Sequence, residues 1–388
     1  MTLVYLLIVT VPALIGLYTL GSTLVGLWRL DRLRDVACRE RESWPRLNIV
    51  SPACNEEKHV QSAVRSMLAL DYPDVSVIVV EDRSTDATGA LLDELAKEHA
   101  RLAVTHLHEL PDGWLGKLNA LQAGVSRCDG DWLLFMDADA HLGALTLKRA
   151  ITYAEQHTLD CLSVIPEVAP AGLLGDAAFN VSLALMSNGG RLREVRDPKS
   201  RHVAATGAFI LVRKAAFDRT PGFEWLRLEV ADDFGLVLLM KSHGGRCDIV
   251  IGRGEVTLEW YASFGEMTRA MQKNFFAIMA RFSLVRSIAL SAFASWMALY
   301  GLAAFMPVSV ALRALCAVGL MSMTAATVVA ASVTGRSWPR ALLWPLGFLG
   351  LAWISLRSGL VGHRLRGIEW RGVVYPSALL RAHQRVRV

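Results

Sequence analysis

The chain has 388 residues, of which 20% are charged and 53% hydrophobic, and its formal net charge is +5. This composition is too apolar for an ordinary soluble enzyme, and the apolar excess lies at the two ends, whereas the middle has the composition of a soluble domain. The positive charge adjoins the apolar runs, so anionic lipid headgroups are the expected partner and nucleic acid is not.

The N-terminal run of residues 3–28 contains no charged side chain. It exceeds the roughly 20 residues that cross a bilayer, so we expect a membrane anchor over residues 1–28. A cleaved signal peptide is the alternative, but no basic residue precedes the run, and the run is long for a signal core. Six arginines follow in the basic juxtamembrane segment 29–46. By the positive-inside rule they place the next domain in the cytoplasm.

Residues 47–259 alternate between strand and helix patterns, which predicts an α/β domain with a mostly parallel sheet. Helical periodicity begins at Val60 and appears again over residues 86–99 and 232–243. The six cysteines are scattered without a CxxC pair, which indicates a reducing compartment rather than a zinc site or a disulfide framework. The predicted strands are 48–51, 75–80, 132–136, 161–165, 207–212 and 247–251.

Residues 260–284 place apolar side chains on one helical stripe. We expect an amphipathic helix in the membrane interface, with an ordinary surface helix as the alternative. The region 285–362 contains two to three membrane segments, and Pro345 and Arg357 interrupt the last of them. A third span would carry the tail outside, yet the basic tail 363–388 holds six arginines, which favour the cytoplasm. The last segment is therefore re-entrant or interfacial, or the rule is broken.

Acidic residues follow the predicted strand 75–80 directly. In open α/β sheets, ligands bind at the carboxyl ends of the strands, so Glu81 and Asp82 stand where a ligand is expected. A carboxylate there can accept a hydrogen bond from a ribose hydroxyl or a base N–H. Helix capping by Ser84 or Asp86 is the alternative use of this segment. We expect Asp82 to contact a ligand and Asp86 to cap the helix.

A second acidic pair, Asp137 and Asp139, follows the predicted strand 132–136. If the strand geometry continues, residues two apart point to the same side, so both carboxylates would face one cation. Oxygen ligands suit Mg²⁺ or Mn²⁺. A metal that bridges a nucleoside diphosphate lowers the barrier to its departure. Many surface turns contain such a pair, and its position after an apolar strand is what favours a metal site.

A third pair, Asp232 and Asp233, opens the predicted helix 232–243. Two carboxylates at a helix N-terminus are stabilised by the helix dipole, so capping is the alternative. The functional interpretation makes Asp233 a general base that takes a proton from an acceptor hydroxyl.

Two further segments fit the same picture. Pro52, Asn55 and Glu56 follow the first predicted strand, where a base-binding loop would lie. Lys117 stands near the start of a helical stretch, where it could pair with a phosphate assisted by the helix N-terminus. A solvated lysine in a turn is an equally good interpretation of Lys117.

Together these motifs resemble the family 2 glycosyltransferases, which have the Rossmann-like GT-A fold. The resemblance runs over residues 47–280, and the order and spacing of the motifs make it specific. Within the family, the chain is most similar to the membrane-bound branch of ceramide glucosyltransferases and hopanoid-biosynthesis-associated glycosyltransferases. The segments that carry the resemblance are Pro52-x-x-Asn55-Glu56, residues 79–86, Gly113-Trp114-Leu115-Gly116-Lys117, Asp137-x-Asp139, residues 197–207, Asp232-Asp233-x-x-Leu236 and Glu369-Trp370-Arg371-Gly372.

The resemblance implies roles for individual residues. Asp139, with Asp137 beside it, would hold Mg²⁺ or Mn²⁺, and Asp233 would be the base of an inverting single displacement, with Asp232 adjacent. Asp232 stands where the family usually has glutamate. The donor nucleotide-sugar would contact Pro52, Asn55, Glu56, Glu81, Asp82, Lys117, Asp137 and Gly207.

One family motif is altered in this chain. The Gln-x-x-Arg-Trp motif keeps Gln272, which the resemblance places on the acceptor side, but has Phe275 and Phe276 in place of arginine and tryptophan. In processive enzymes the motif supports acceptor and product binding. Its alteration argues against a polysaccharide synthase and for the transfer of a single sugar to a lipid.

The sequence thus predicts an inverting glycosyltransferase that uses a nucleotide-sugar, a UDP-hexose, and glycosylates a lipid hydroxyl. We expect an integral protein of a bacterial inner membrane with a cytoplasmic catalytic domain. A polyprenyl-phosphate acceptor is the second hypothesis. A membrane scaffold without activity is the third, and the intact acidic clusters speak against it.

Overall fold

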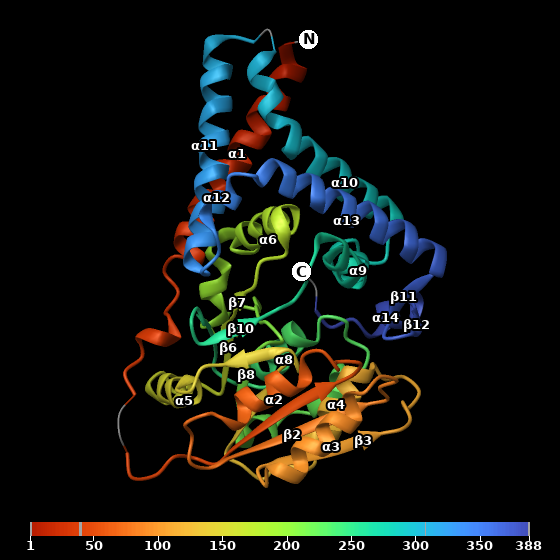
Figure 1. The fold of residues 1–388 in the computed structure, drawn as a ribbon. Helices are drawn as coiled ribbons and strands as arrows, with labels where there is room; N and C mark the ends of the chain where they lie inside the picture. Colours follow the sequence, from red (N-terminus) through yellow and green to blue (C-terminus); the bar gives the residue numbers. More distant parts are fainter. Residues whose placement is uncertain (1, 39–40, 307, 387–388) are drawn as a thin grey trace.

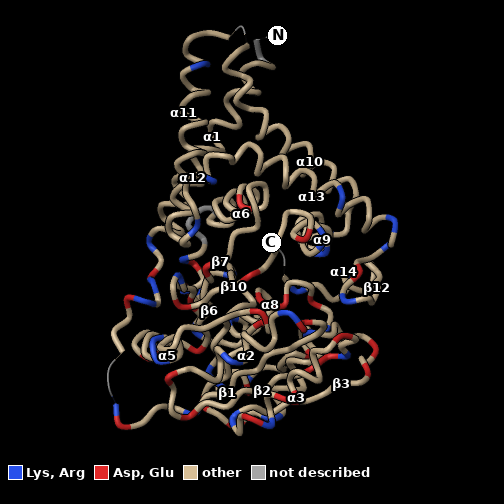
Figure 2. The backbone as a smooth tube through the Cα atoms, viewed as in Figure 1, with Lys and Arg blue, Asp and Glu red and all other residues tan. Residues whose placement is uncertain are grey.

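The computed structural model describes residues 2–38, 41–306 and 308–386 (Figure 1). Residues 1, 39–40, 307 and 387–388, which belong to the predicted anchor, juxtamembrane, membrane and tail segments, lie outside the described residues. In Figure 1 an α/β domain occupies the lower half, and long helices from both ends of the chain occupy the upper half. Figure 2 shows charged residues gathered in the domain and sparse along the upper helices.

The domain is built on a mixed sheet with the strand order β3-β2-β1-β4-β8-β6-β9. Its pairs are parallel except that β8 runs antiparallel to both neighbours. The predicted mostly parallel α/β class is therefore confirmed. Its strands are β1 (Leu47–Ala53), β2 (Val75–Asp82), β3 (Leu102–Leu107), β4 (Trp132–Phe135), β6 (Cys161–Ile165), β8 (Ile210–Arg213) and β9 (Cys247–Ile251).

Helices cover both faces of this sheet. One apolar core joins α2 (Val60–Leu68), α3 (Thr88–Glu98) and α5 (Thr146–Gln156) to the strands. A second core joins α4 (Gly116–Val125) and α8 (Asp232–Ser242) to the other face. The apolar side chains of α2 recur at spacings of three and four, so one stripe of the helix is buried against the sheet.

A small sheet with the order β5-β10-β7 extends the carboxyl end of the main sheet. It consists of β5 (Ala140–Leu142), β7 (Glu167–Val168) and β10 (Val256–Leu258). Because β5 begins directly after Asp139, the acidic turn between β4 and β5 is fixed by a strand on each side.

Long apolar helices lie above the α/β domain in the view of Figure 1. Among the described residues, the helices of sufficient length and hydropathy to cross a membrane lie at Val4–Gly26 in α1 (Thr2–Gly26), Leu284–Phe305, Val310–Val333 and Trp344–Leu365. The second comprises α10 (Leu284–Leu299) and a 3₁₀ turn, the third is α11, and the fourth is α13. Close packing of α1 on α11 needs glycine, because a Cβ on Gly16 would lie 2.6 Å from the carbonyl oxygen of Gly319.

Pro345 does not interrupt the last of these helices. It stands in the first turn of α13, where no intrahelical N–H donor is required of it. Figure 1 shows α13 crossing obliquely to α1 and α11 and packing along α10. It starts near the shorter apolar helix α6 (Gly172–Met186), where a Cβ on Gly347 would clash with the carbonyl group of Ala177.

The basic tail is folded. It forms a hairpin of β11 (Gly367–Trp370) and β12 (Val373–Pro376), followed by helix α14 (Ser377–His383). Arg371 in the hairpin turn donates to Glu56 at 2.6 Å. The backbone N–H groups of Arg385 and Val386 donate to the buried carboxylate of Glu229, at 2.6 and 3.0 Å. The described part of the tail, up to Val386, therefore lies directly on the α/β domain.

Candidate active site

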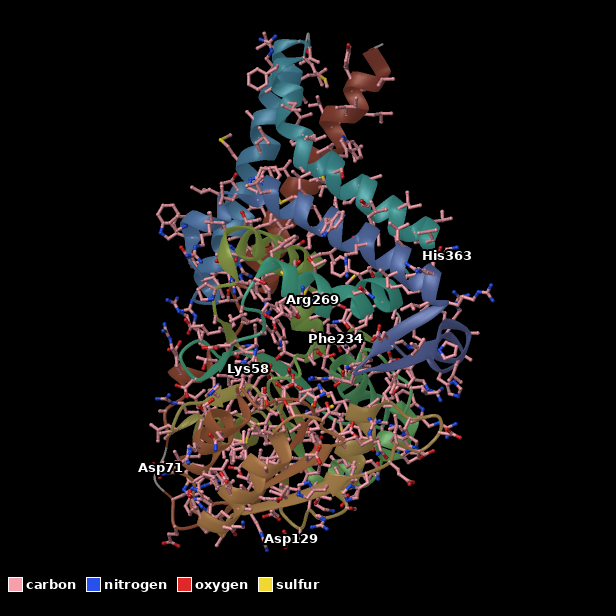
Figure 3. All side chains as sticks on the ribbon, turned by 45° about the vertical axis from the view of Figure 1, so that its right-hand side comes forward. Lys58, Asp71, Asp129, Phe234, Arg269 and His363 are labelled. Atoms are coloured by element: carbon pink, nitrogen blue, oxygen red, sulfur yellow. The ribbon has the colours of Figure 1, made fainter. Side chains whose placement is uncertain are left out.

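A cavity of about 2030 Å³ opens at the carboxyl ends of β1, β2 and β4. Small-molecule sites usually measure about 300–1,000 Å³, so this one has room for two substrates. It is lined by members of all three acidic clusters: Asp82, Asp86, Asp137, Asp139, Asp232 and Asp233. It continues upward between α6, α9 (Phe264–Asn274), α10 and α13. In Figure 3, Lys58, Phe234 and Arg269, which line the cavity, lie between the sheet and the upper helices.

Lys117 stands at the centre of the acidic residues. Its Nζ lies 2.7 Å from a carboxylate oxygen of Asp137 and 2.7 Å from one of Asp232. Burial alone would lower the pKa of Lys117, but the two carboxylates outweigh it and raise the pKa above its ordinary value. The residue is therefore a fixed cation that ties the start of α8 to the turn after β4.

Gly207 leaves the space that this arrangement needs. A Cβ at this position would lie 2.7 Å from Asp137 Oδ2 and 3.0 Å from Lys117 Nζ. Its carbonyl oxygen also accepts the backbone N–H of Asp137 at 3.0 Å. Any larger residue would push the ion pair apart.

Asp139 has one carboxylate oxygen, Oδ1, that is buried and accepts no hydrogen bond from the described residues. Burial, and then the charges of Asp137 and Glu56, raise the pKa of Asp139 to about 7. A cation bound to that oxygen would remove this penalty, so the residue fits a metal ligand.

No group of three or more His, Cys, Asp or Glu side chains forms a ready metal cage in the described part of the chain. A metal at Asp139 would therefore take most of its oxygen ligands from water and from the phosphates of a substrate, as Mg²⁺ commonly does.

Asp233 lies in the first turn of α8, and its Oδ1 accepts the N–H of Phe234 at 2.8 Å. Burial, and then the charge of Asp232, raise the pKa of Asp233 to about 7, while Lys117 opposes the rise. A carboxylate with a pKa near neutrality is suited to accept a proton at physiological pH. Its neighbour Asp232 is held by Lys117 at 2.7 Å.

The loop after β1 is tied to the loop after β2. Asn55 has a φ of 55°, a left-handed conformation that asparagine tolerates, and its Oδ1 accepts the N–H of Thr85 at 2.8 Å. The N–H of Glu56 donates to Thr88 Oγ1 at 2.8 Å. Asp86 accepts the N–H of Thr88 at 3.0 Å, the bond expected of a capping residue. Pro52, Asn55 and Glu56 line the cavity as one wall.

The two acids after β2 have different surroundings. Asp82 lines the cavity, and Arg83 donates to both of its oxygens, at 2.7 and 3.0 Å. Glu81 is absent from the cavity lining among the described residues. It accepts the N–H of Ser84 and contacts His106 Nδ1 at 3.1 Å. Its geometry supports the turn rather than contact with a ligand.

Gln272 does not face the cavity either. Its side-chain oxygen accepts from Arg357 at 2.5 Å, and its backbone oxygen accepts from Ser358 at 2.5 Å, so it fastens α9 to α13. The next residue, Lys273, lines the cavity with its Nζ 3.8 Å from the centre of the Trp370 ring. Burial lowers the pKa of Lys273 to about 8. The structure thus places Lys273 where the sequence suggested Gln272.

Sequence reasoning also missed Arg371 and Trp370 as lining residues. Both belong to the tail segment Glu369-Trp370-Arg371-Gly372, which carried part of the family resemblance. That resemblance was the available signal, but no site role was given to either residue.

Residues 48–220 match the family model described as Glycosyl transferase family 2. The beta-monoglucosyldiacylglycerol synthase of Synechocystis sp. is 27% identical over 221 residues, which cover 54% of this chain and 43% of the relative. The protein of the same name from Trichormus variabilis is 26% identical over 249 residues, which cover 60% of this chain and 50% of the relative. The chain matches half the length of these curated relatives or less.

Among solved structures, the mannosyltransferase PcManGT from Pyrobaculum calidifontis, in complex with GDP-Man and Mn²⁺, matches with a TM-score of 0.49 and 16% identity. The match covers 92% of this chain and 98% of that one.

Proposed function

We propose, from the premise that residues 48–220 are a family 2 glycosyl transferase domain, that this chain moves one sugar from a nucleotide-sugar to the hydroxyl group of a membrane lipid. The family expected from the sequence is confirmed by this match. The observation that carries the proposal is the continuity of one cavity, which joins Asp139 and Asp233 to the apolar helices above them.

The lower part of the cavity suits the donor. A UDP-hexose would lay its base and ribose against the loop of Pro52, Asn55 and Glu56, and its diphosphate near Asp139 and Lys117. Mg²⁺ or Mn²⁺ would be held by Asp139, with Asp137 close by, and would neutralise charge on the departing diphosphate.

Asp233 is the proposed general base. It takes the proton of the acceptor hydroxyl as that oxygen forms a bond to the anomeric carbon, and the bond from this carbon to the diphosphate breaks. Attack from the side opposite the leaving group in a single displacement inverts the configuration. Lys117 holds the side chain of Asp232 in place, and the charge of Asp232 raises the pKa of Asp233, which favours the protonated form of Asp233 after the transfer.

The catalytic domain would face the cytoplasm of a bacterium, below the inner membrane. The arginines of residues 29–46 and of the tail support this orientation. The oblique course of α13 supports a last segment that enters and leaves on the domain side, because the hairpin after it contacts Glu56.

A polyprenyl phosphate is the second candidate acceptor, and Lys273 favours it. The Nζ of Lys273 has no carboxylate within ion-pair distance among the described residues, and it contacts Asn274 Oδ1 and the Trp370 ring. A phosphate from a substrate would match this buried ammonium.

Replacing Asp233 by asparagine tests the proposal. General bases contribute about 10²–10⁴-fold, so we expect transfer to a lipid hydroxyl to fall by at least about 100-fold, while binding of the nucleotide-sugar persists. The exposed Asp218→Asn is the matched control. Full activity of Asp233→Asn with a hydroxyl acceptor would sink the base assignment, and transfer that persists with polyprenyl phosphate alone would favour the second acceptor.

A further inference from the structure

The upper part of the cavity has a chemistry unlike the lower part. Its walls come from α6, α9, the π-helical turn Phe275–Met279, α10 and α13. Many of the side chains there are apolar, and these include Phe179, Leu183, Met271, Ile278, Leu290 and Leu351. A nucleotide-sugar has nothing to bury against such walls, so this part of the cavity is built for a different molecule.

Two serine hydroxyl groups in this upper part are satisfied within their own helices. Ser182 Oγ donates to the carbonyl of Ala178 at 2.9 Å, and Ser355 Oγ donates to that of Leu351 at 2.8 Å. These hydroxyl groups need no partner from a ligand. The apolar walls therefore recognise an apolar body by area and length, and polar recognition falls to the charged side chains of α9 and to the carboxylates and Lys117 below.

The upper end of the cavity is lined by side chains that are themselves accessible. Met279 and Phe293 line the cavity and are 48% and 37% exposed. Leu290, one turn before Phe293 on α10, also lines the cavity, and α10 contacts the π-helical turn that holds Met279. We call Met279, Leu290 and Phe293 the portal side chains. The chain bends sharply there, because Arg281 and Phe282 have φ values of 49° and 58°.

The outer face around the portal is apolar as well. On α10, Val285 and Ile288 are 75% and 47% exposed, and this helix belongs to a segment long and apolar enough to cross a membrane. Lipid, not water, is the medium that covers such a face at low cost. A molecule that enters between the portal side chains therefore comes from the lipid layer itself.

We infer that the portal side chains form a lateral entry through which an acylated lipid passes from the bilayer into the upper cavity, with its hydroxyl headgroup first. This inference rests on the proposed function. The headgroup would reach Asp233 while the acyl chains stay between α6, α9 and α10 or trail into the membrane. The cavity volume agrees, since it holds a nucleotide-sugar and still leaves space for a headgroup with part of its chains.

Narrowing the portal tests the inference. In the full-length protein in lipid nanodiscs, we would compare Met279→Trp and Phe293→Trp with Ile288→Trp, which changes an exposed residue of α10 that does not line the cavity. Initial rates would be measured with dioleoylglycerol and with the short-chain dihexanoylglycerol at saturating donor. The portal variants should raise KM for dioleoylglycerol by about tenfold or more, and leave kcat and the KM for dihexanoylglycerol unchanged. The control should match the unmodified protein.

Equal effects on both acceptors, or no effect on either, would overturn the portal. A second readout does not depend on turnover: a diacylglycerol with a diazirine near its headgroup should label the upper cavity, and the portal variants should block the labelling. If the unmodified protein transfers sugar to neither acylglycerol but is labelled in this way, the portal stands and the acylglycerol acceptor falls. Absence of labelling in the unmodified protein overturns the inference.

Discussion

Replacing Lys117 by methionine removes the ammonium that lies 2.7 Å from both Asp137 and Asp232. Removing one partner of a buried ion pair costs about 3–5 kcal/mol, and because the Lys117 side chain is still 23% exposed we expect the lower end, about 3 kcal/mol. This is less than the stability of a typical domain, so the variant should fold. Because Lys117 lowers the pKa of Asp233, its removal should shift the acidic limb of the pH–rate profile to higher pH.

The assay is sugar transfer against pH at saturating donor, together with thermal unfolding of the same preparations. Lys117→Arg should keep most of the stability, because the charge remains. Lys214→Met is the matched control, since it breaks the exposed pair with Asp218, which is worth about 0.3–0.5 kcal/mol. The reasoning is refuted if the acidic limb of Lys117→Met stays where it is, or if its loss of stability is no greater than that of Lys214→Met.

Three further predictions concern the same site. In the unmodified protein, the rate of sugar transfer should rise about tenfold per pH unit below pH 7 and level off above it. The reason is that only the ionised form of Asp233 accepts a proton, and the pKa of Asp233 is about 7. A rate that is flat between pH 5 and 7 would contradict this. The same raised pKa favours the protonated carboxyl in the folded state, so the contribution of Asp233 to stability should fall as pH rises from about 4 to 7, which thermal unfolding against pH would measure. Gly207→Ala should lower the stability of the folded protein by about 1–3 kcal/mol and remove most of the activity, because the new Cβ would press on Asp137 Oδ2 and Lys117 Nζ. Gly21→Ala is the control, since its Cβ would meet no atom within 4 Å. Equal stability and activity of the two variants would rule out the steric argument.

The central strands were predictable because they are buried on both faces. Apolar, β-branched runs such as β2 stand out in any reading of the sequence. The antiparallel direction of β8 was not predictable, since buried apolar residues carry no sign of strand direction. The edge strand β3 was missed because most of its residues are only partly buried, which leaves no continuous apolar run.

The site residues that stand directly after or beside the strands of the sheet were predictable. Asp137, Asp139 and Asp233 come together in the cavity as their positions after or beside sheet elements suggested. Gln272 shows the limit of a motif, because the residue is kept while its side chain pairs with Arg357 on another helix. The contact of Arg371 with Glu56 could not be predicted either, because the two residues are far apart in the sequence and no local pattern links them.

The contact between Arg371 and Glu56 joins residues 315 positions apart. During synthesis the whole α/β domain emerges before the hairpin exists, and at about 5–20 residues per second the stretch from residue 260 to 371 takes roughly 5–20 s. Over that interval the cavity lacks the wall formed by Trp370 and Arg371. The apolar helices between residues 260 and 371 must be in place before this wall can form. The nascent domain therefore cannot complete this wall of its site until the helices between have been made, and the hydrogen bond from Val386 to the buried Glu229 belongs to the same last step.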